Sequence, residues 1–217
     1  MRASMLADPD RARRAHQIRN PRNLILNVAR RILEEGGREA LNLRAISLEA
    51  KVSLGTIYHY YDSKHALLAG LAVEGFDELT RRMLRAFNTR GGETGLRATG
   101  YAYIDFLRER PALYQVMFDA VDRGEQPQVL EAEIRAFRVL ADSIPFAPGA
   151  QIISSATAED MAQAMWAWGR GIAAVGFSRG GRSRPPETLT VESALNGLHA
   201  IFEWRTPEVP RSGLQRN

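Results

Sequence analysis

The 217-residue sequence contains no cysteine, and this absence excludes several kinds of chemistry. There can be no disulfide, no zinc site built on thiolates and no thiol nucleophile. Long hydrophobic runs are also missing, since no stretch approaches the ~20 apolar residues that a membrane-spanning helix needs. The arginines near the N-terminus have no apolar segment behind them, which predicts that they do not belong to a secretory signal. Together these absences favour a cytoplasmic protein.

Lysine is scarce, because 27 of the 29 basic residues are arginine. The formal net charge of +4 is a weak indication of a polyanionic partner. Its distribution is more informative, because six arginines stand against two aspartates in residues 1–22. We interpret residues 1–18 as a flexible basic arm. A solvated tail without a partner is an equally good interpretation.

Signatures of an enzyme are missing as well. The sequence has no glycine-rich phosphate loop and no Gly-x-Ser-x-Gly turn. No two of its histidines have the spacing of a metal-ligand pair. The four histidines are His16, His59, His65 and His199. The sequence therefore predicts a protein that is not an enzyme and that uses no metal and no cofactor.

Apolar residues recur at the 3.6-residue period of a helix almost throughout the chain. The pattern predicts an all-α fold of about nine helices. The first helix should begin at Asn20-Pro21 and end at Gly36-Gly37, because asparagine caps, proline starts and glycine stops helices. Further helices are expected at about 43–50 and 54–60, from Asp62 or Ser63 to Gly91-Gly92, at about 93–109, 111–121 and 127–142, from Thr157 onwards, and after the break at 178–186. Residues 143–156 resemble a loop.

Two short helices joined by a tight turn are typical of a helix-turn-helix unit. Ser53 can cap the second of them, in which Ile57 faces the core. Tyr58, His59 and Tyr60 then fall largely on the other faces. An exposed face with phenol and imidazole groups suits the major groove of DNA. The alternative is a small three-helix module whose surface tyrosines have no role.

The residues around this face add to the DNA-binding hypothesis. Gly55 lacks a Cβ atom, so the backbone can approach DNA or the preceding helix closely. Lys64 stands at the start of the next helix, whose free amides suit a phosphate. Arg44, at the start of the first short helix, could reach a base or a phosphate.

The stretch LNLRAISLEAKVSLGTIYHYYDSKHALL resembles the DNA-binding domain of the TetR/AcrR family of bacterial transcriptional regulators. The similarity runs from about Pro21 to Glu78, with many matched positions at fixed spacing. It implies phosphate contacts from Thr56, Tyr60 and Lys64. The DNA-binding residues that we expect are Arg44, Ser53, Leu54, Gly55, Thr56, Tyr58, His59, Tyr60 and Lys64.

Two residues depart from the family pattern. Lys51 stands where the family usually has the turn glycine, and a left-handed backbone there would cost on the order of 1 kcal/mol. A phosphate contact of the lysine could offset part of this cost. Leu54 replaces a frequent polar residue and could contact a thymine methyl group.

The resemblance also implies a division of the chain. Residues 19–79 would form the DNA-binding domain, residues 80–205 the effector-binding and dimerisation domain, and residues 206–217 a disordered tail. The second domain resembles a subgroup marked by Trp-x-x-x-His-Gly, but Arg170 replaces the histidine. The expected ligand-binding residues are Tyr103, Phe106, Tyr114, Phe118, Met165, Trp166 and Trp168, although each of them also fits a plain core.

The resemblance implies that the chain regulates transcription, and the composition is consistent with this function. The chain would be a homodimer, joined through its last two helices, that represses transcription from a palindromic double-stranded DNA operator. A small apolar or aromatic effector would release it. Small residues in 166–176 favour close helix contacts, either in the dimer or inside one chain. A DNA-binding regulator without a ligand, an activator and a ligand carrier are the alternatives.

Overall fold

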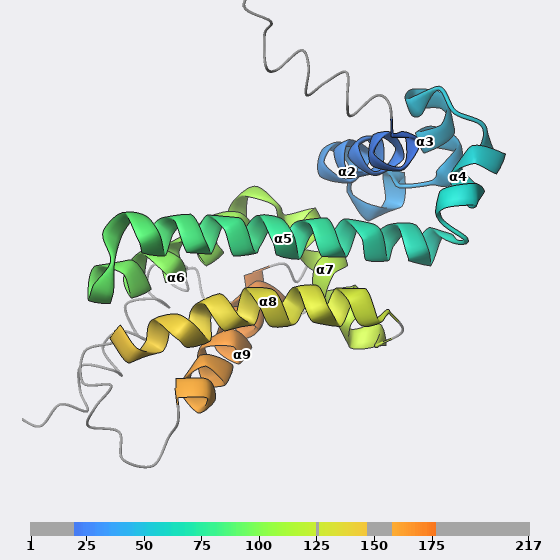
Figure 1. Cartoon of the computed structure of the whole chain (residues 1–217). Coiled ribbons are helices and arrows are strands. Elements are labelled where there is room, and N and C mark those ends of the chain that lie inside the picture. The colour runs from blue at the N-terminus through green and yellow to red at the C-terminus, as the bar shows by residue number, and fades with distance from the viewer. Residues whose placement is uncertain (1–19, 125, 147–157, 177–217) are drawn as a thin grey trace, which may run out of the picture. The chain divides into compact units, whose positions relative to one another are not determined.

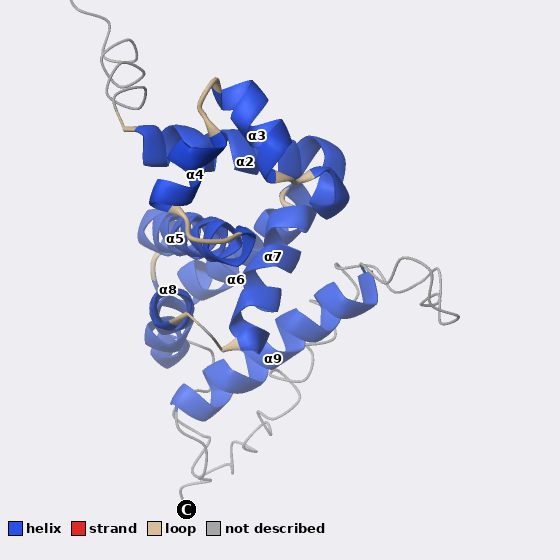
Figure 2. Ribbon diagram, turned by 90° about the vertical axis from the view of Figure 1, so that its right-hand side faces the viewer, coloured by secondary structure: helices blue, strands red, loops and turns tan. Residues whose placement is uncertain are grey.

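The computed structural model describes residues 20–124, 126–146 and 158–176, and Figure 1 gives the helix labels. These residues form eight α-helices and one 3-10 turn, without a strand, which confirms the all-α prediction (Figure 2). The predicted basic arm, the final helix and the C-terminal tail lie outside the described residues. The elements are α2 (Pro21–Ala40), α3 (Leu43–Ala50), α4 (Leu54–Tyr60), α5 (Lys64–Arg90), α6 (Gly92–Glu109), α7 (Pro111–Arg123), α8 (Pro127–Ser143), η1 (Ile144–Phe146) and α9 (Ala158–Gly176).

The described helices pack into two compact units. The first unit holds the described residues up to Leu79 together with Arg108–Ala136. The second unit holds Thr80–Leu107 and the described residues from Phe137 onwards. Three helices, α5, α6 and α8, therefore contribute residues to both units.

Side-chain caps fix where the helices of the first unit begin. At Ser53 the hydroxyl accepts a hydrogen bond from the Thr56 amide over 3.0 Å. Ser63 and not Asp62 caps α5, because its Oγ accepts from the Ala66 amide over 3.1 Å. Asparagines cap the two earlier helices in the same way, Asn20 for α2 and Asn42 for α3. Such caps depend on neighbouring residues only, which is why the sequence predicts these starts well.

The end of α2 differs from the prediction. Gly37 does leave the helical conformation, with φ 71° and ψ −173°, but a further helical turn follows and reaches Ala40. Glycine takes this positive φ without a Cβ penalty. Arg38, in the added turn, forms an ion pair with Asp119 of α7. This partner lies far along the chain, so the local sequence gave no sign of it.

The core of the first unit joins the three N-terminal helices to the start of α5. Figure 1 shows α3 and α4 beside α2, and α2 also contacts α7. On α7, Phe118 lies edge-on to Phe76 of α5, with 5.3 Å between the ring centroids. The fully buried aliphatic side chains of this core come from every one of these helices: Ile25, Leu33, Leu41, Ile46, Ile57, Leu67, Leu71, Leu79 and Leu113.

A network of ion pairs crosses the same unit. Arg30 of α2 reaches Glu34 Oε1 over 2.9 Å and Glu78 Oε2 of α5 over 2.5 Å. Arg110, just before α7, reaches Glu34 Oε1 over 3.1 Å. Burial acts to lower the pKa of Arg30, but the two carboxylates outweigh it, so the pKa lies above its ordinary value. The network ties α2 to α5 and to the start of α7.

The second unit has an aromatic core. Phe106 of α6 is fully buried, and Tyr103 lies edge-on to Trp166 of α9 with 5.6 Å between the ring centroids. Phe87 of α5 lies 5.3 Å from Phe146 of η1, again between ring centroids. These contacts bring α5, α6, η1 and α9 into one unit.

Candidate nucleic-acid interface and ligand hollow

The turn between α3 and α4 is built around Lys51. Its backbone is left-handed, with φ 54° and ψ 40°, which is the conformation that the family glycine would take most easily. The Lys51 side chain is exposed. Below the turn, the Ser47 hydroxyl donates a hydrogen bond to the Val52 carbonyl over 2.6 Å. The chain therefore accepts backbone strain at an exposed lysine of the turn.

One side of α3 and α4 is exposed and carries polar, aromatic and apolar groups, and we call it the α3–α4 face. Tyr58 exposes 51% of its surface and Leu54 exposes 38%. Arg44 and His59 are also exposed. Leu48 of α3, at 80%, is the most exposed large hydrophobic residue among those described. Sequence reasoning missed Leu48, although it stands four residues after Arg44 and so on the same side of the helix.

Gly55 and its neighbours have separate roles in α4. A Cβ atom at Gly55 would meet only the Ser53 hydroxyl, at an ordinary 3.6 Å, so helix packing does not require a glycine here. The Thr56 hydroxyl lies 2.9 Å from the same Ser53 hydroxyl. Tyr60 is half-buried and stacks edge-on with His59 at 5.0 Å between ring centroids. Contact with the preceding helix is therefore not what places a glycine at this position.

The face continues into the start of α5. Lys64 is the first residue of that helix and its side chain is exposed. Ser63 satisfies the Ala66 amide through its side chain. The positive end of the helix dipole and the lysine charge therefore stand together, as a phosphate group would require.

Tyr61 attaches this region to the core. It is buried, and its hydroxyl donates a hydrogen bond to the Arg22 carbonyl over 3.4 Å. The Arg22 guanidinium lies 5.7 Å from the centre of the ring. Burial raises the pKa of Tyr61, against the opposing effect of Arg22. The phenol therefore stays neutral and serves the fold, while Tyr58 remains available to a partner.

The second unit contains an open hollow with mainly apolar walls. Four of the seven predicted ligand residues line it: Tyr103, Met165, Trp166 and Trp168. The other lining residues were not expected at a ligand site from the sequence: Met83, Thr99, Gly100, Ile104, Leu140 and Gly169.

The three other predicted ligand residues lie elsewhere. Phe106 is buried in the second unit, with the Arg82 guanidinium 5.5 Å from its ring centre. Tyr114 and Phe118 belong to the core of the first unit, where their ring centroids are 4.6 Å apart. Helical periodicity predicts that all three lie on the apolar face of a helix, but it does not predict which residues they contact.

The small residues of α9 do not share one environment. A Cβ atom at Gly169 would come within 2.8 Å of the Tyr103 ring, so Gly169 is needed for packing inside its own chain. At Gly171 a Cβ atom would meet nothing within 4 Å. Arg170, in the position of the subgroup histidine, is half-buried. The internal explanation therefore holds for Gly169, whereas no described residue crowds Gly171.

The described residues show two absences. No group of three or more imidazoles and carboxylates among them could hold a metal ion. None of their helices is both long and apolar enough to cross a membrane.

Two family models match the chain and together account for more than half of it. The model of the bacterial regulatory proteins of the tetR family matches residues 25–71. The model of the Tetracyclin repressor-like C-terminal domain matches residues 96–196. The first match covers the α3–α4 face, and the second covers most of the ligand hollow.

Curated relatives agree with these matches. The HTH-type transcriptional repressor KstR of Mycolicibacterium smegmatis is 32% identical over 127 residues, which are 58% of this chain and 53% of that protein. The uncharacterized HTH-type transcriptional regulator YobS of Bacillus subtilis is 28% identical over 92 residues, which are 42% of this chain and 48% of that protein. The matches thus span about half the length of these relatives. Because the relatives are transcriptional regulators, they confirm the prediction that the chain is not an enzyme.

Solved structures show the same fold over nearly the whole chain. A protein of unknown function from Rhodococcus sp. RHA1 has a TM-score of 0.68 at 25% identity, covering 84% of this chain and 93% of that one. A bacterial regulatory protein of the tetR family from Rhodococcus RHA1 has a TM-score of 0.59 at 19% identity, covering 85% and 96%. With both family models matched and the fold shared, the chain belongs to the TetR family of bacterial transcriptional regulators.

Proposed function

We propose that the chain is a dimeric, sequence-specific DNA-binding repressor that a small apolar or aromatic molecule releases from a palindromic operator. The observation that carries the proposal is the α3–α4 face. It exposes a tyrosine, a histidine, an arginine and two leucines on a rigid three-helix scaffold. Together these side chains can contact phosphates, base edges and thymine methyl groups.

Within this proposal, some residues of the face contact bases and others contact phosphates. Arg44, Leu54, Tyr58 and His59 contact bases, and the backbone at Gly55 approaches the groove. The phosphate contacts come from Thr56, Tyr60 and Lys64, while Ser53 holds the end of α4. Only Arg44 has the bidentate geometry that discriminates a base pair by about 1–3 kcal/mol. Shape and apolar contacts therefore supply part of the specificity.

The apolar hollow is the proposed effector site. Tyr103, Trp166 and Trp168 offer ring surfaces, and Met165 offers a side chain that adapts to different ligand shapes. The helix α5 runs without interruption from Lys64 to Met83 of the hollow. A ligand that displaces this helix changes the position of the phosphate contact. The ligand must bind the DNA-incompetent state more tightly than the competent one, or the equilibrium does not shift.

The dimer is the remaining part of the proposal. Its contacts come from α9 and from the expected helix that follows, so that two recognition helices stand about 34–36 Å apart. The functional division at residues 79 and 80 is also a proposal. The helix α7 packs in the same unit as the DNA-binding helices, although its residues lie after position 79. The boundary between packing units therefore differs from the proposed boundary between functional domains. Such a regulator would work in the cytoplasm on the bacterial nucleoid.

A binding experiment with the full chain tests the proposal. Labelled DNA from the region upstream of its own gene is titrated with the protein, with a scrambled fragment of equal length as control. We expect saturable binding to the upstream fragment at a salt concentration where the scrambled fragment does not bind. Aromatic and apolar small molecules are then screened for release. DNA binding that no ligand reverses would remove the effector from the proposal, and equal binding to both fragments would refute sequence-specific recognition.

A further inference from the structure

A second open hollow lies in the first unit, at the junction of α2, α5 and α7, and its lining includes charged side chains, whereas the lining of the ligand hollow has none. We call it the polar hollow. Its walls carry the charged side chains of Arg38 from the end of α2 and of Asp119 and Arg123 from α7, and the imidazole of His65 from the start of α5. Gln126 adds a side-chain amide.

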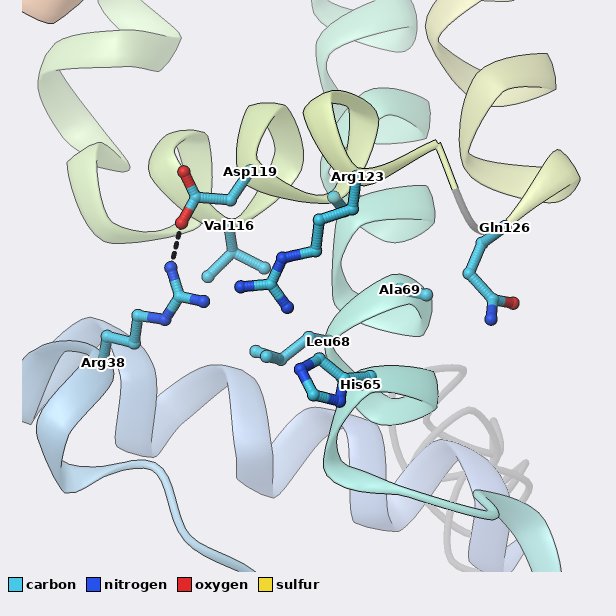
Figure 3. Close-up of a pocket in the computed structure, with 9 residues that line it drawn as sticks. Arg38, His65, Leu68, Ala69, Val116, Asp119, Arg123 and Gln126 are labelled. Atoms are coloured by element: carbon cyan, nitrogen blue, oxygen red, sulfur yellow. Dashed lines mark hydrogen bonds and ion pairs between the residues drawn. The ribbon is translucent and has the colours of Figure 1, made fainter.

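The charges on these walls do not balance. Asp119 is the one carboxylate of the lining, and it forms an ion pair with Arg38. Arg123 has no hydrogen-bonding or ionic partner among the described residues. Figure 3 shows its guanidinium turned back over the hollow, between Arg38 and the ring of His65. Among the described lining residues, the hollow thus carries one positive charge in excess, with the imidazole of His65 beside it.

The floor of the hollow is apolar. Leu68 and Ala69 of α5 and Val116 of α7 line it, and all three are buried. The side chains of Arg123 and His65 are exposed beside this floor, so an anion can reach them from solvent. The planar fork of arginine matches the two oxygens of a carboxylate or a phosphate better than any other side chain does.

We propose that the polar hollow binds a small organic anion, with a carboxylate or phosphate group on Arg123 and His65 and a short carbon chain on the floor. The Arg38–Asp119 pair stays in place and forms one wall. The anion bridges α5 and α7 next to the end of α2, so it stabilises the unit that bears the DNA-binding face. This site is separate from the effector hollow and does not depend on the proposed release of DNA.

Calorimetric titration of the full chain tests the site with three probes of similar shape: butyrate, butyl phosphate and uncharged butanol. Sodium chloride holds the ionic strength constant. We expect one saturable site for at least one of the two anions and none for butanol, and the anion that binds identifies the charged group. The same anion should raise the melting temperature, because it binds the folded chain. If neither anion saturates, the proposal is wrong.

Matched variants locate the site. Arg123→Gln should weaken anion binding about tenfold or more, which corresponds to one lost charged contact. Arg90→Gln is the control, since Arg90 and Arg123 both stand in the last turn of a helix and lose the same dipole interaction. His65→Gln should weaken binding as well. Equal affinity in Arg123→Gln and the wild type would overturn the proposal.

A further variant excludes the apolar hollow as the binding place. Trp168→Ala enlarges that hollow in the second unit and leaves the polar hollow intact. Its affinity for the anion should equal that of the wild type. Loss of anion binding in Trp168→Ala together with full binding in Arg123→Gln would place the anion in the effector hollow and refute the assignment.

Discussion

Tyr58 and Tyr103, one tyrosine from each unit, differ strongly in exposure. On α4 of the first unit, Tyr58 leaves 51% of its surface exposed. In the second unit, Tyr103 exposes 8% and meets Trp166 and Gly169. Residue type alone therefore does not separate a nucleic-acid contact from a ligand contact. What differs between these two tyrosines is their burial, since Tyr58 is exposed on α4 and Tyr103 meets Trp166 and Gly169 inside its own unit.

Substitution of two neighbouring residues of α4 should have very different effects on the free energy of unfolding. Ile57→Ala should lower the free energy of unfolding by about 2–5 kcal/mol, because Ile57 is fully buried and its removal leaves a cavity. Tyr58→Ala should change the same quantity by less than about 0.5 kcal/mol, as is usual for an exposed residue. Urea unfolding of both variants measures the difference. Similar losses would mean that Tyr58 belongs to the core.

The second prediction concerns the two environments of α9. Gly169→Ala should destabilise the chain by about 1–3 kcal/mol, since the new methyl group meets the Tyr103 ring, and it should narrow the ligand hollow. Thermal unfolding measures the first effect. Gly171→Leu should leave the fold of the chain intact and weaken the dimer, which sedimentation measures. A dimer of unchanged strength would remove this part of α9 from the proposed interface.

A gain in stability is expected at the turn of the first unit. Lys51→Gly relieves a positive φ and should stabilise the fold by about 1 kcal/mol, as chemical unfolding would report. If Lys51 contacts a phosphate, the same variant should weaken operator binding and reduce the slope of its salt dependence by about 1. A more stable variant with unchanged operator affinity would show that Lys51 makes no such contact.

The first unit was also the easier one to predict, for a physical reason. The bounds of α3 and α4 follow from Asn42 and Ser53, which act on amides three residues away. The extra turn after Gly37 could not be foreseen, because Arg38 finds its partner at Asp119. In the second unit the lining of the hollow depends on which helices meet, and periodicity does not encode that choice. This is why Tyr114 was expected at the ligand site and lies in the other unit.

On our proposal, the α3–α4 face and the start of α5 contact operator DNA. Fluorescence anisotropy with an operator fragment tests it most directly, using Tyr58→Ala and Lys64→Ala. The matched control is Tyr101→Ala, since Tyr101 of the second unit exposes 47% of its surface. We expect each of the two variants to bind the operator about tenfold or more weakly, with the fold and the control unchanged. Full operator affinity in both variants would contradict the account.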